Sequence, residues 1–276
     1  MPLPGGLWHN DQCYREFGFR PLTGAVELAV SEASQFVGTR PEAVTDLLQA
    51  SLGHLGGLEP DTVLIDTLSV GDRHFLTTRL FAWLGKDEAW FTVDCQACNA
   101  HFDFPLRFSS LPVKPAGPSY PFCETILGAG TFKWRVPNGA DQKVLALLPE
   151  NADTVRVLLQ HCLVEGKTAA GGVALDRLIA DLTDLEIAQV EAALEGQAPE
   201  VATLAQATCP GCFRVNMIQI DPFLYLNAPF QGISTDVHRI ASVYHWSEAE
   251  ILSLPSQRRQ RYLDLIDRER GATTPP

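Results

Sequence analysis

Two short cysteine pairs, Cys95-Gln-Ala-Cys98 and Cys209-Pro-Gly-Cys212, most strongly constrain what this chain can fold into. A Cys-x-x-Cys turn can direct both thiols at one point, and two such turns supply the four thiolates of a tetrahedral zinc shell. Zinc-binding pairs of this kind usually lie about 15–20 residues apart, whereas residues 99–208 separate these two. The pairs therefore predict either a zinc ribbon with a domain-sized insertion or two repeated units that each contribute one pair.

Three matches between the two halves of the chain favour a repeat. Residues 17–25 and 132–140 share Phe, Arg, Gly and Ala in register, and residues 44–52 and 155–163 share Val, Leu, Leu, Gln and Leu. The offsets are 115 and 111 residues, and the cysteine pairs repeat at 114. Three matches in one order at nearly one offset predict an internal duplication.

Each half has the sequence pattern of a short strand, several helices and a hairpin whose turn is the cysteine pair. Strands are expected at 17–22, 131–136 and 101–108, the last from alternating apolar residues. Helices are expected after Thr23 and Asn138, over 72–84, and after the capping boxes 39–42 and 183–186.

The sequence therefore predicts an α+β protein of two related helix-plus-hairpin units, joined through a zinc ribbon and followed by a helical C-terminal tail. The first unit spans residues 1–108, a Pro-rich linker 109–121, the second unit 122–222 and the tail 223–276. We assign Cys95, Cys98, Cys209 and Cys212 as ligands of one structural Zn²⁺ per chain.

The sequence leaves other interpretations of the cysteines open. The four cysteines could be small hydrophobic residues buried in the core. Alternatively, a Cys-x-x-Cys pair could be redox-active, which requires that it lie at a helix N-terminus. His101, three residues after Cys98, could replace one cysteine, although a polar strand residue is the simpler interpretation. Cys13, Cys123 and Cys162 are unpaired, and Cys162 lies in an apolar helical pattern typical of core packing.

Composition, charge and the motifs present argue against several classes of protein. Apolar residues make up 46% of the chain, which argues against wholesale disorder. The formal charge of −12 disfavours a nucleic-acid-binding protein. The sequence has no signal-peptide pattern and no apolar run long enough to span a membrane, so we expect a cytoplasmic protein. It contains no nucleophile–base or phosphate-loop motif, so we expect no enzymatic activity.

The tail carries two features of interest. Arg258, Arg259 and Arg261 form the densest basic cluster, which we expect to be a solvated helix face paired with nearby acidic residues. The alternative is that they dock on an acidic partner. The aromatic residues Tyr244 and Trp246, on either side of His245, are typical of core packing, but they could also anchor a partner.

The order of these elements resembles a known family. The matching stretches are the two cysteine pairs, Arg20-Pro-Leu-Thr-Gly24, Val70-Gly-Asp-Arg73, Arg135-Val-Pro-Asn138, and the tail pattern from Val237 to Pro255. It is similar to the baseplate family related to T-even phage hub-assembly factors, which is also encoded with phage-tail-like contractile injection systems.

The resemblance implies a non-enzymatic baseplate component or hub-assembly factor of a contractile phage-tail-like particle. Its partners would be baseplate or hub proteins, and it would act in the cytoplasm of the producing bacterial cell or within the assembled particle. Gln96 stands where the family often has Pro. The alternative function is a zinc-ribbon nucleic-acid-binding regulator, which would need a basic face.

Overall fold

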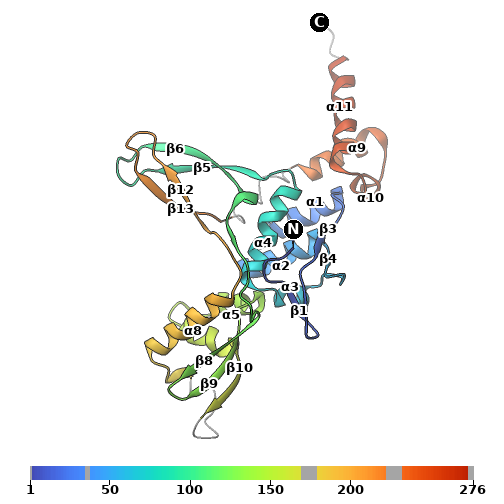
Figure 1. The fold of residues 1–276 in the computed structure, drawn as a ribbon. Helices are drawn as coiled ribbons and strands as arrows, with labels where there is room; N and C mark the ends of the chain where they lie inside the picture. Colours follow the sequence, from blue (N-terminus) through green and yellow to red (C-terminus); the bar gives the residue numbers. More distant parts are fainter. Residues whose placement is uncertain (1, 35–37, 169–178, 222–231, 273–276) are drawn as a thin grey trace.

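The computed structural model describes residues 2–34, 38–168, 179–221 and 232–272, and combines helices with small antiparallel sheets (Figure 1). The first part contains β1 Leu7–His9, β2 Gln12–Tyr14, β3 Phe17–Phe19, α1 Gly24–Ser34, α2 Arg40–Ser51, β4 Leu52–Leu55, α3 Thr62–Thr67, α4 Val70–Trp83, β5 Glu88–Asp94, β6 His101–Arg107 and β7 Val113–Lys114. The second contains β8 Phe122–Leu127, β9 Gly130–Arg135, α5 Gly139–Ala146, α6 Thr154–Cys162, β10 Leu163–Thr168, α8 Asp184–Gln197, β11 Glu200–Val201, β12 Leu204–Thr208 and β13 Val215–Gln219. The tail contains α9 Ile233–Tyr244, α10 Glu248–Leu252 and α11 Ser256–Ala272. The α+β class predicted from the sequence is confirmed.

The described residues contain three clusters of buried apolar side chains. The largest surrounds α2 and α4 and includes Phe75 and Leu80. A second lies between α8 and the sheet β10–β9–β8, around Trp134. A third, around Ile240 and Ile251, is confined to the three tail helices. In Figure 1 the sheet with α8 and the tail lie on different sides of the central helices.

Two strand–helix–helix–strand segments have the same pairing. In the first, β3 pairs antiparallel with β4 and Phe19 lies opposite Leu52. In the second, β9 pairs antiparallel with β10 and Trp134 lies opposite Leu163. A register shift interrupts each ladder beside this pair.

The predicted helix starts are found close to their expected positions. Capping boxes precede α2 and α8 as expected, and the Asn138 side chain accepts a hydrogen bond from the Asp141 amide at the start of α5. A third capping box, Ser247 with Glu250, precedes α10. Helix α4 begins two residues earlier than expected, because the Ser69 side chain accepts from the Asp72 amide and caps it.

The first predicted strand is shorter than expected, ending at Phe19 rather than at residue 22. The Arg20 amide still donates to the Ser51 carbonyl over 2.8 Å. Pro21 has no N–H to continue the ladder, which accounts for the early end.

The Pro-rich segment 109–121 makes regular contacts with both parts of the chain. Its strand β7 pairs with β11, with Val113 opposite Val201. The Ala116 amide donates to the Pro4 carbonyl, and the Gly117 amide donates to the Gln197 carbonyl. The predicted boundary between the second unit and the tail, at residue 222, lies outside the described residues.

One expectation for the tail is wrong. Arg258 and Arg261 are exposed, as a solvated helix face requires, but Arg259 is only 2% exposed. Its guanidinium forms an ion pair with Glu27 of α1, not with the acidic residues of its own helix. The i,i+4 spacing on one helix gives no information about a partner 232 residues away.

The tail aromatic residues pack on one another. Tyr244 and Trp246 stack with ring centroids 5.3 Å apart, and both contact Tyr262 edge-on. The core-packing interpretation of these residues agrees with this cluster, in which both are half-buried. None of the helices in the described ranges has the length and hydropathy that a membrane crossing requires.

Candidate metal centre

The two cysteine pairs form the tips of two hairpins, β5–β6 and β12–β13, whose strands are paired along their length. The two turns have the same backbone hydrogen bonds. The Cys95 amide donates to the Ala100 carbonyl over 3.0 Å, and the Asn99 amide donates to the Cys95 carbonyl over 2.8 Å. In the second turn, the Cys209 amide donates to the Arg214 carbonyl and the Phe213 amide donates to the Cys209 carbonyl, over 2.9 Å each. The residue after each pair has a left-handed backbone conformation, with φ of 55° at Asn99 and 61° at Phe213.

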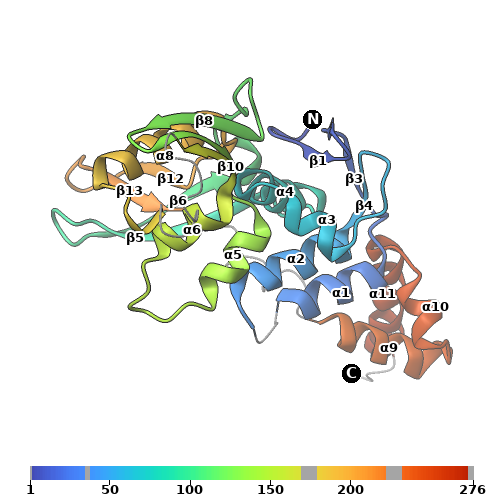
Figure 2. The same cartoon turned by 90° about the horizontal axis from the view of Figure 1, so that it is seen from below.

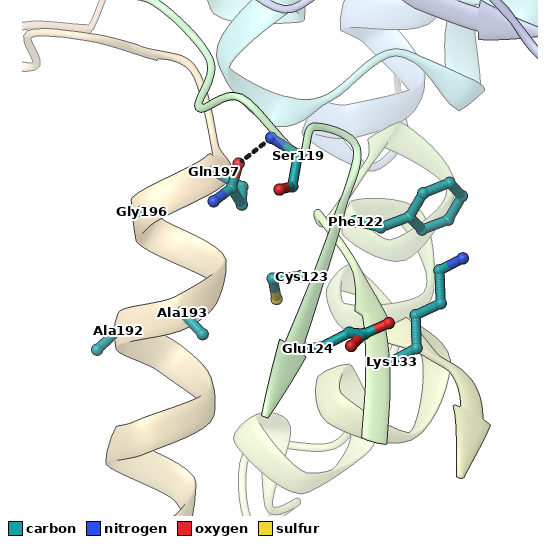
Figure 3. Close-up of a pocket in the computed structure, with 9 residues that line it drawn as sticks. All are labelled: Ser119, Phe122, Cys123, Glu124, Lys133, Ala192, Ala193, Gly196 and Gln197. Carbon is teal, nitrogen blue, oxygen red and sulfur yellow. Dashed lines mark hydrogen bonds between the residues drawn. The ribbon is translucent and has the colours of Figure 1, made fainter. Parts of the chain in front are cut away.

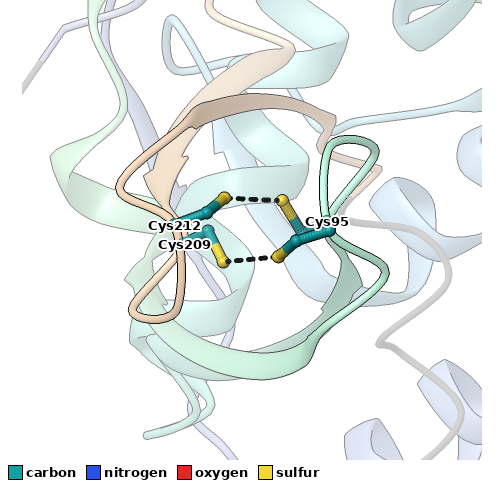
Figure 4. A group of neighbouring side chains, drawn as sticks. Cys95, Cys209 and Cys212 are labelled. Carbon is teal, nitrogen blue, oxygen red and sulfur yellow. Dashed lines mark hydrogen bonds between the residues drawn. The ribbon is translucent and has the colours of Figure 1, made fainter.

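The hairpins meet tip to tip and bring the four thiols together (Figure 4). The Cys95 and Cys212 sulfurs lie 3.5 Å apart and the Cys98 and Cys209 sulfurs 3.7 Å apart, and all four lie within 4.8 Å of one another. These separations are too long for disulfides, whose sulfurs are about 2.05 Å apart. They match the edges of a tetrahedron with metal–sulfur bonds of about 2.3 Å, whose corners lie about 3.8 Å apart. The four cysteines thus form a cluster that can hold a metal ion.

The electrostatics of the cluster favour a bound cation. The Ala97 amide hydrogen bond is the main cause that lowers the pKa of Cys95 to about 6. At Cys98 the Ala100 amide acts in the same direction, but the neighbouring thiols and burial raise the pKa to about 12. Thiolates this close repel one another, so four of them carry charge together only around a cation.

The donor set and the turn geometry bear on the other interpretations. Both pairs lie between strands rather than at a helix N-terminus, the position typical of a thioredoxin-like redox pair. Four thiolates complete a tetrahedral shell and leave no position for water or substrate, which is the pattern of structural rather than catalytic sites. Cys95 and Cys209 are fully buried, so one ligand of each turn lies inside the hairpin junction.

His101 and the remaining cysteines lie outside this cluster. The His101 side chain is 78% exposed and contacts Asp94 across the hairpin. Cys13 is exposed, whereas Cys123 and Cys162 are buried, as expected for Cys162. Cys123 faces α8 across a hollow of about 460 Å³ beside Ala193 (Figure 3), and burial raises its pKa to about 11.

Asn216 also supports the cluster, a role that no local sequence pattern predicts. Its side chain is 9% exposed, and its amide donates to the Cys95 sulfur over 3.8 Å and to the Arg214 carbonyl over 3.1 Å. Its carbonyl accepts from the Gln96 amide over 3.3 Å, so one side chain of the second hairpin holds the turn of the first. Its neighbours Val215 and Met217 are apolar but exposed, so the alternation of apolar residues in this strand predicts an exposed Asn216 and gives no signal of its burial.

Replacing Asn216 by Leu is expected to weaken metal binding about 10–100-fold, the usual loss when a group that orients a ligand is removed. Competition with a chromophoric chelator measures this affinity. Gln219→Ala, an exposed residue of the same strand, is the matched control and should leave the affinity unchanged. Equal affinity in N216L and Q219A would show that Asn216 does not support the thiolate.

Phe213 is poorly suited to its backbone conformation. A left-handed conformation costs a non-glycine residue about 1–2 kcal/mol, and Asn adopts it more readily than Phe. The Phe213 side chain is 79% exposed, so it gains little from burial. Phe213→Asn is therefore expected to stabilise the metal-loaded protein by about 1 kcal/mol in denaturant unfolding. Asn99→Phe, the reciprocal change in the first turn, should destabilise it by a similar amount. A destabilised F213N would show instead that the aromatic ring is bound by the fold.

The chain matches no protein-family model, no curated protein and no solved structure.

Proposed function

We propose that the four cysteines bind one structural Zn²⁺, so that the two hairpins form a single zinc ribbon. The observation that carries this proposal is the closed set of four thiols, contributed by two turns with the same backbone geometry. Each hairpin is a separate two-stranded sheet, and an isolated two-stranded hairpin is marginally stable in water. The metal would therefore supply the folding free energy that holds the tips together.

The ribbon would join two units that arose by duplication. Both parts have a strand, two helices and an antiparallel strand, in that order. A hairpin follows in each, after α3 and α4 in the first part and after α8 and β11 in the described residues of the second. The pairing of Phe19 with Leu52 and of Trp134 with Leu163 supports this proposal, because the sequence matches place these residues at equivalent positions. In this proposal each unit contributes one half of the zinc ribbon.

As a function, we propose a non-enzymatic baseplate component or hub-assembly factor of a contractile phage-tail-like particle. The order of motifs and the tail pattern support this assignment, and a closed thiolate site is consistent with a structural role. The protein would act through contacts with baseplate or hub proteins, in the cytoplasm of the producing cell or in the particle itself.

Native mass spectrometry tests the zinc proposal directly. We expect one zinc per chain in the native mass and none after acid denaturation, because protonated thiols release the metal. A metal-free chain that retains its fold would contradict the proposal. Two metal ions per chain would contradict the shared site.

Deleting the encoding gene in a producer strain tests the role in assembly. We expect lysates that contain sheath and tube proteins but lack complete particles, and restoration by the wild-type gene. Quantitative mass spectrometry of wild-type particles then separates the two roles: a fixed copy number identifies a component, and absence identifies an assembly factor. Normal, infectious or toxin-delivering particles from the deletion strain would refute the proposal.

A further inference from the structure

Two helices of this chain dock at their N-terminal ends on two other helices in the same way. At the start of α5, the Gly139 amide donates to the Leu68 carbonyl over 3.1 Å. Asn138 forms an isolated antiparallel β-bridge with Ser69, which lies just before α4. At the start of α1, the Gly24 amide donates to the Leu254 carbonyl over 3.1 Å, and Thr23 forms a bridge with Pro255, just before α11.

A buried arginine completes each junction. Arg73 lies five residues after Leu68, and Arg259 lies five residues after Leu254. Each arginine is 2% exposed. Arg73 lies over Gly139, which begins α5, and Arg259 lies over Gly24, which begins α1. A Cβ on Gly139 would lie 2.5 Å from the nearest Arg73 nitrogen, and a Cβ on Gly24 would lie 2.7 Å from that of Arg259. Glycine thus leaves room for the guanidinium at both positions.

The two junctions differ in what surrounds them. Helix α4 is part of the largest core, through Phe75 and Leu80, so it cannot separate without exposing that core. The buried cluster of α9, α10 and α11 contains only tail residues. These three helices form a group beside α1 (Figure 2). The tail therefore has a core of its own.

Polar contacts join the tail to the start of α1. Arg259 donates to the Leu254 carbonyl of its own segment over 2.7 Å and forms its ion pair with Glu27 of α1. Ser256 also hydrogen-bonds to Glu27. A junction of this kind can open without breaking up either apolar core.

We propose that the start of α1, Thr23 to Glu27, is a receptor for the tail of a second copy of this chain, and that two copies exchange tails to form a dimer. The structure shows that the tail fits this receptor, and the same contacts form whichever copy supplies the tail. Each copy has one receptor and one tail, so a mutual exchange closes a two-fold dimer with every contact remade. This inference does not depend on the zinc or baseplate proposals.

The intramolecular junction competes with the exchange. A tail tethered to its own receptor has an effective concentration in the millimolar range, so the closed monomer dominates in dilute solution. The test must therefore block closure within one chain and leave an intact junction available only between chains.

Two full-length variants meet this requirement. Glu27→Arg blocks the receptor but keeps a wild-type tail, and Arg259→Glu blocks the tail but keeps a wild-type receptor. Mixed in equal amounts, they can form one junction between chains that consists entirely of wild-type residues. Size-exclusion chromatography with light scattering then measures the mass of each variant and of the mixture.

We expect each variant alone to be monomeric and the mixture to contain a species of twice the chain mass, increasing with concentration. Arg258→Glu changes an exposed neighbour on α11, so its mixture with E27R should stay monomeric because its own tail fills its receptor. Glu27→Ala, which removes the ion-pair partner of Arg259, replaces E27R if that variant does not fold. A mixture that remains monomeric at about 100 µM, with either receptor variant, would overturn the proposal and assign the receptor to the chain's own tail alone.

Discussion

Cys209→Ser is expected to release the metal and leave the protein insoluble or partly unfolded. Apparent binding free energies of structural zinc in small peptides are about 10–16 kcal/mol, which is as large as the whole stability of a typical domain, about 5–15 kcal/mol. Serine is a poor zinc ligand, and Cys209 is fully buried at the hairpin junction. The β12–β13 hairpin would then lose its link to β5–β6, and Cys212→Ser should act in the same way.

Metal content by native mass spectrometry and thermal unfolding of the soluble fraction measure this effect. Cys13→Ser is the matched control, because Cys13 is exposed and lies outside the thiol cluster. We expect C13S to retain one metal ion and the wild-type melting temperature. A C209S protein with unchanged melting would exclude a structural metal at this site.

The local features of this fold are readable from the sequence because they depend on residues a few positions apart. The capping boxes at Thr39 and Thr183 predict where α2 and α8 begin, since the side chains and amides involved belong to one turn. The clustering of the four cysteines was also predictable, although the pairs are far apart in sequence. A Cys-x-x-Cys turn is locally incomplete as a metal site, so it implies a second pair elsewhere.

The features that were not predicted depend on contacts between distant segments. Asn216 holds the turn at Gln96, and Arg259 is buried against Glu27. In both cases the sequence neighbourhood is compatible with an exposed polar residue. Burial of Arg259 follows only from the packing of α11 on α1, which no local pattern encodes. The pairing of Val113 with Val201 depends likewise on how the chain returns to the Pro-rich segment.

Gly71→Ala is expected to destabilise the protein by about 3 kcal/mol, at the upper end of overpacking costs. In most helices this change is stabilising by up to about 1 kcal/mol, because alanine has the higher helix propensity. Here Gly71 of α4 packs against Pro199, which lies between α8 and β11. A Cβ on Gly71 would lie 1.9 Å from the Pro199 carbonyl oxygen and 2.5 Å from its carbonyl carbon. Both are backbone atoms, so no side-chain rotation relieves the clash, and α4 must move away from β11.

Thermal unfolding of the metal-loaded protein measures this change, and a loss of about 3 kcal/mol corresponds to a melting temperature lower by roughly 6–12 °C. Gly196→Ala is the matched control, because Gly196 lies in α8 and a Cβ there would meet nothing within 4 Å. G196A should be stabilised by about 0.5 kcal/mol through helix propensity. The opposite signs in two helical glycines would show that the contact of α4 with Pro199, rather than helix propensity, decides the outcome at Gly71. If G71A melts at or above the wild-type temperature, the first turn of α4 does not pack on the second part of the chain as closely as this structure requires.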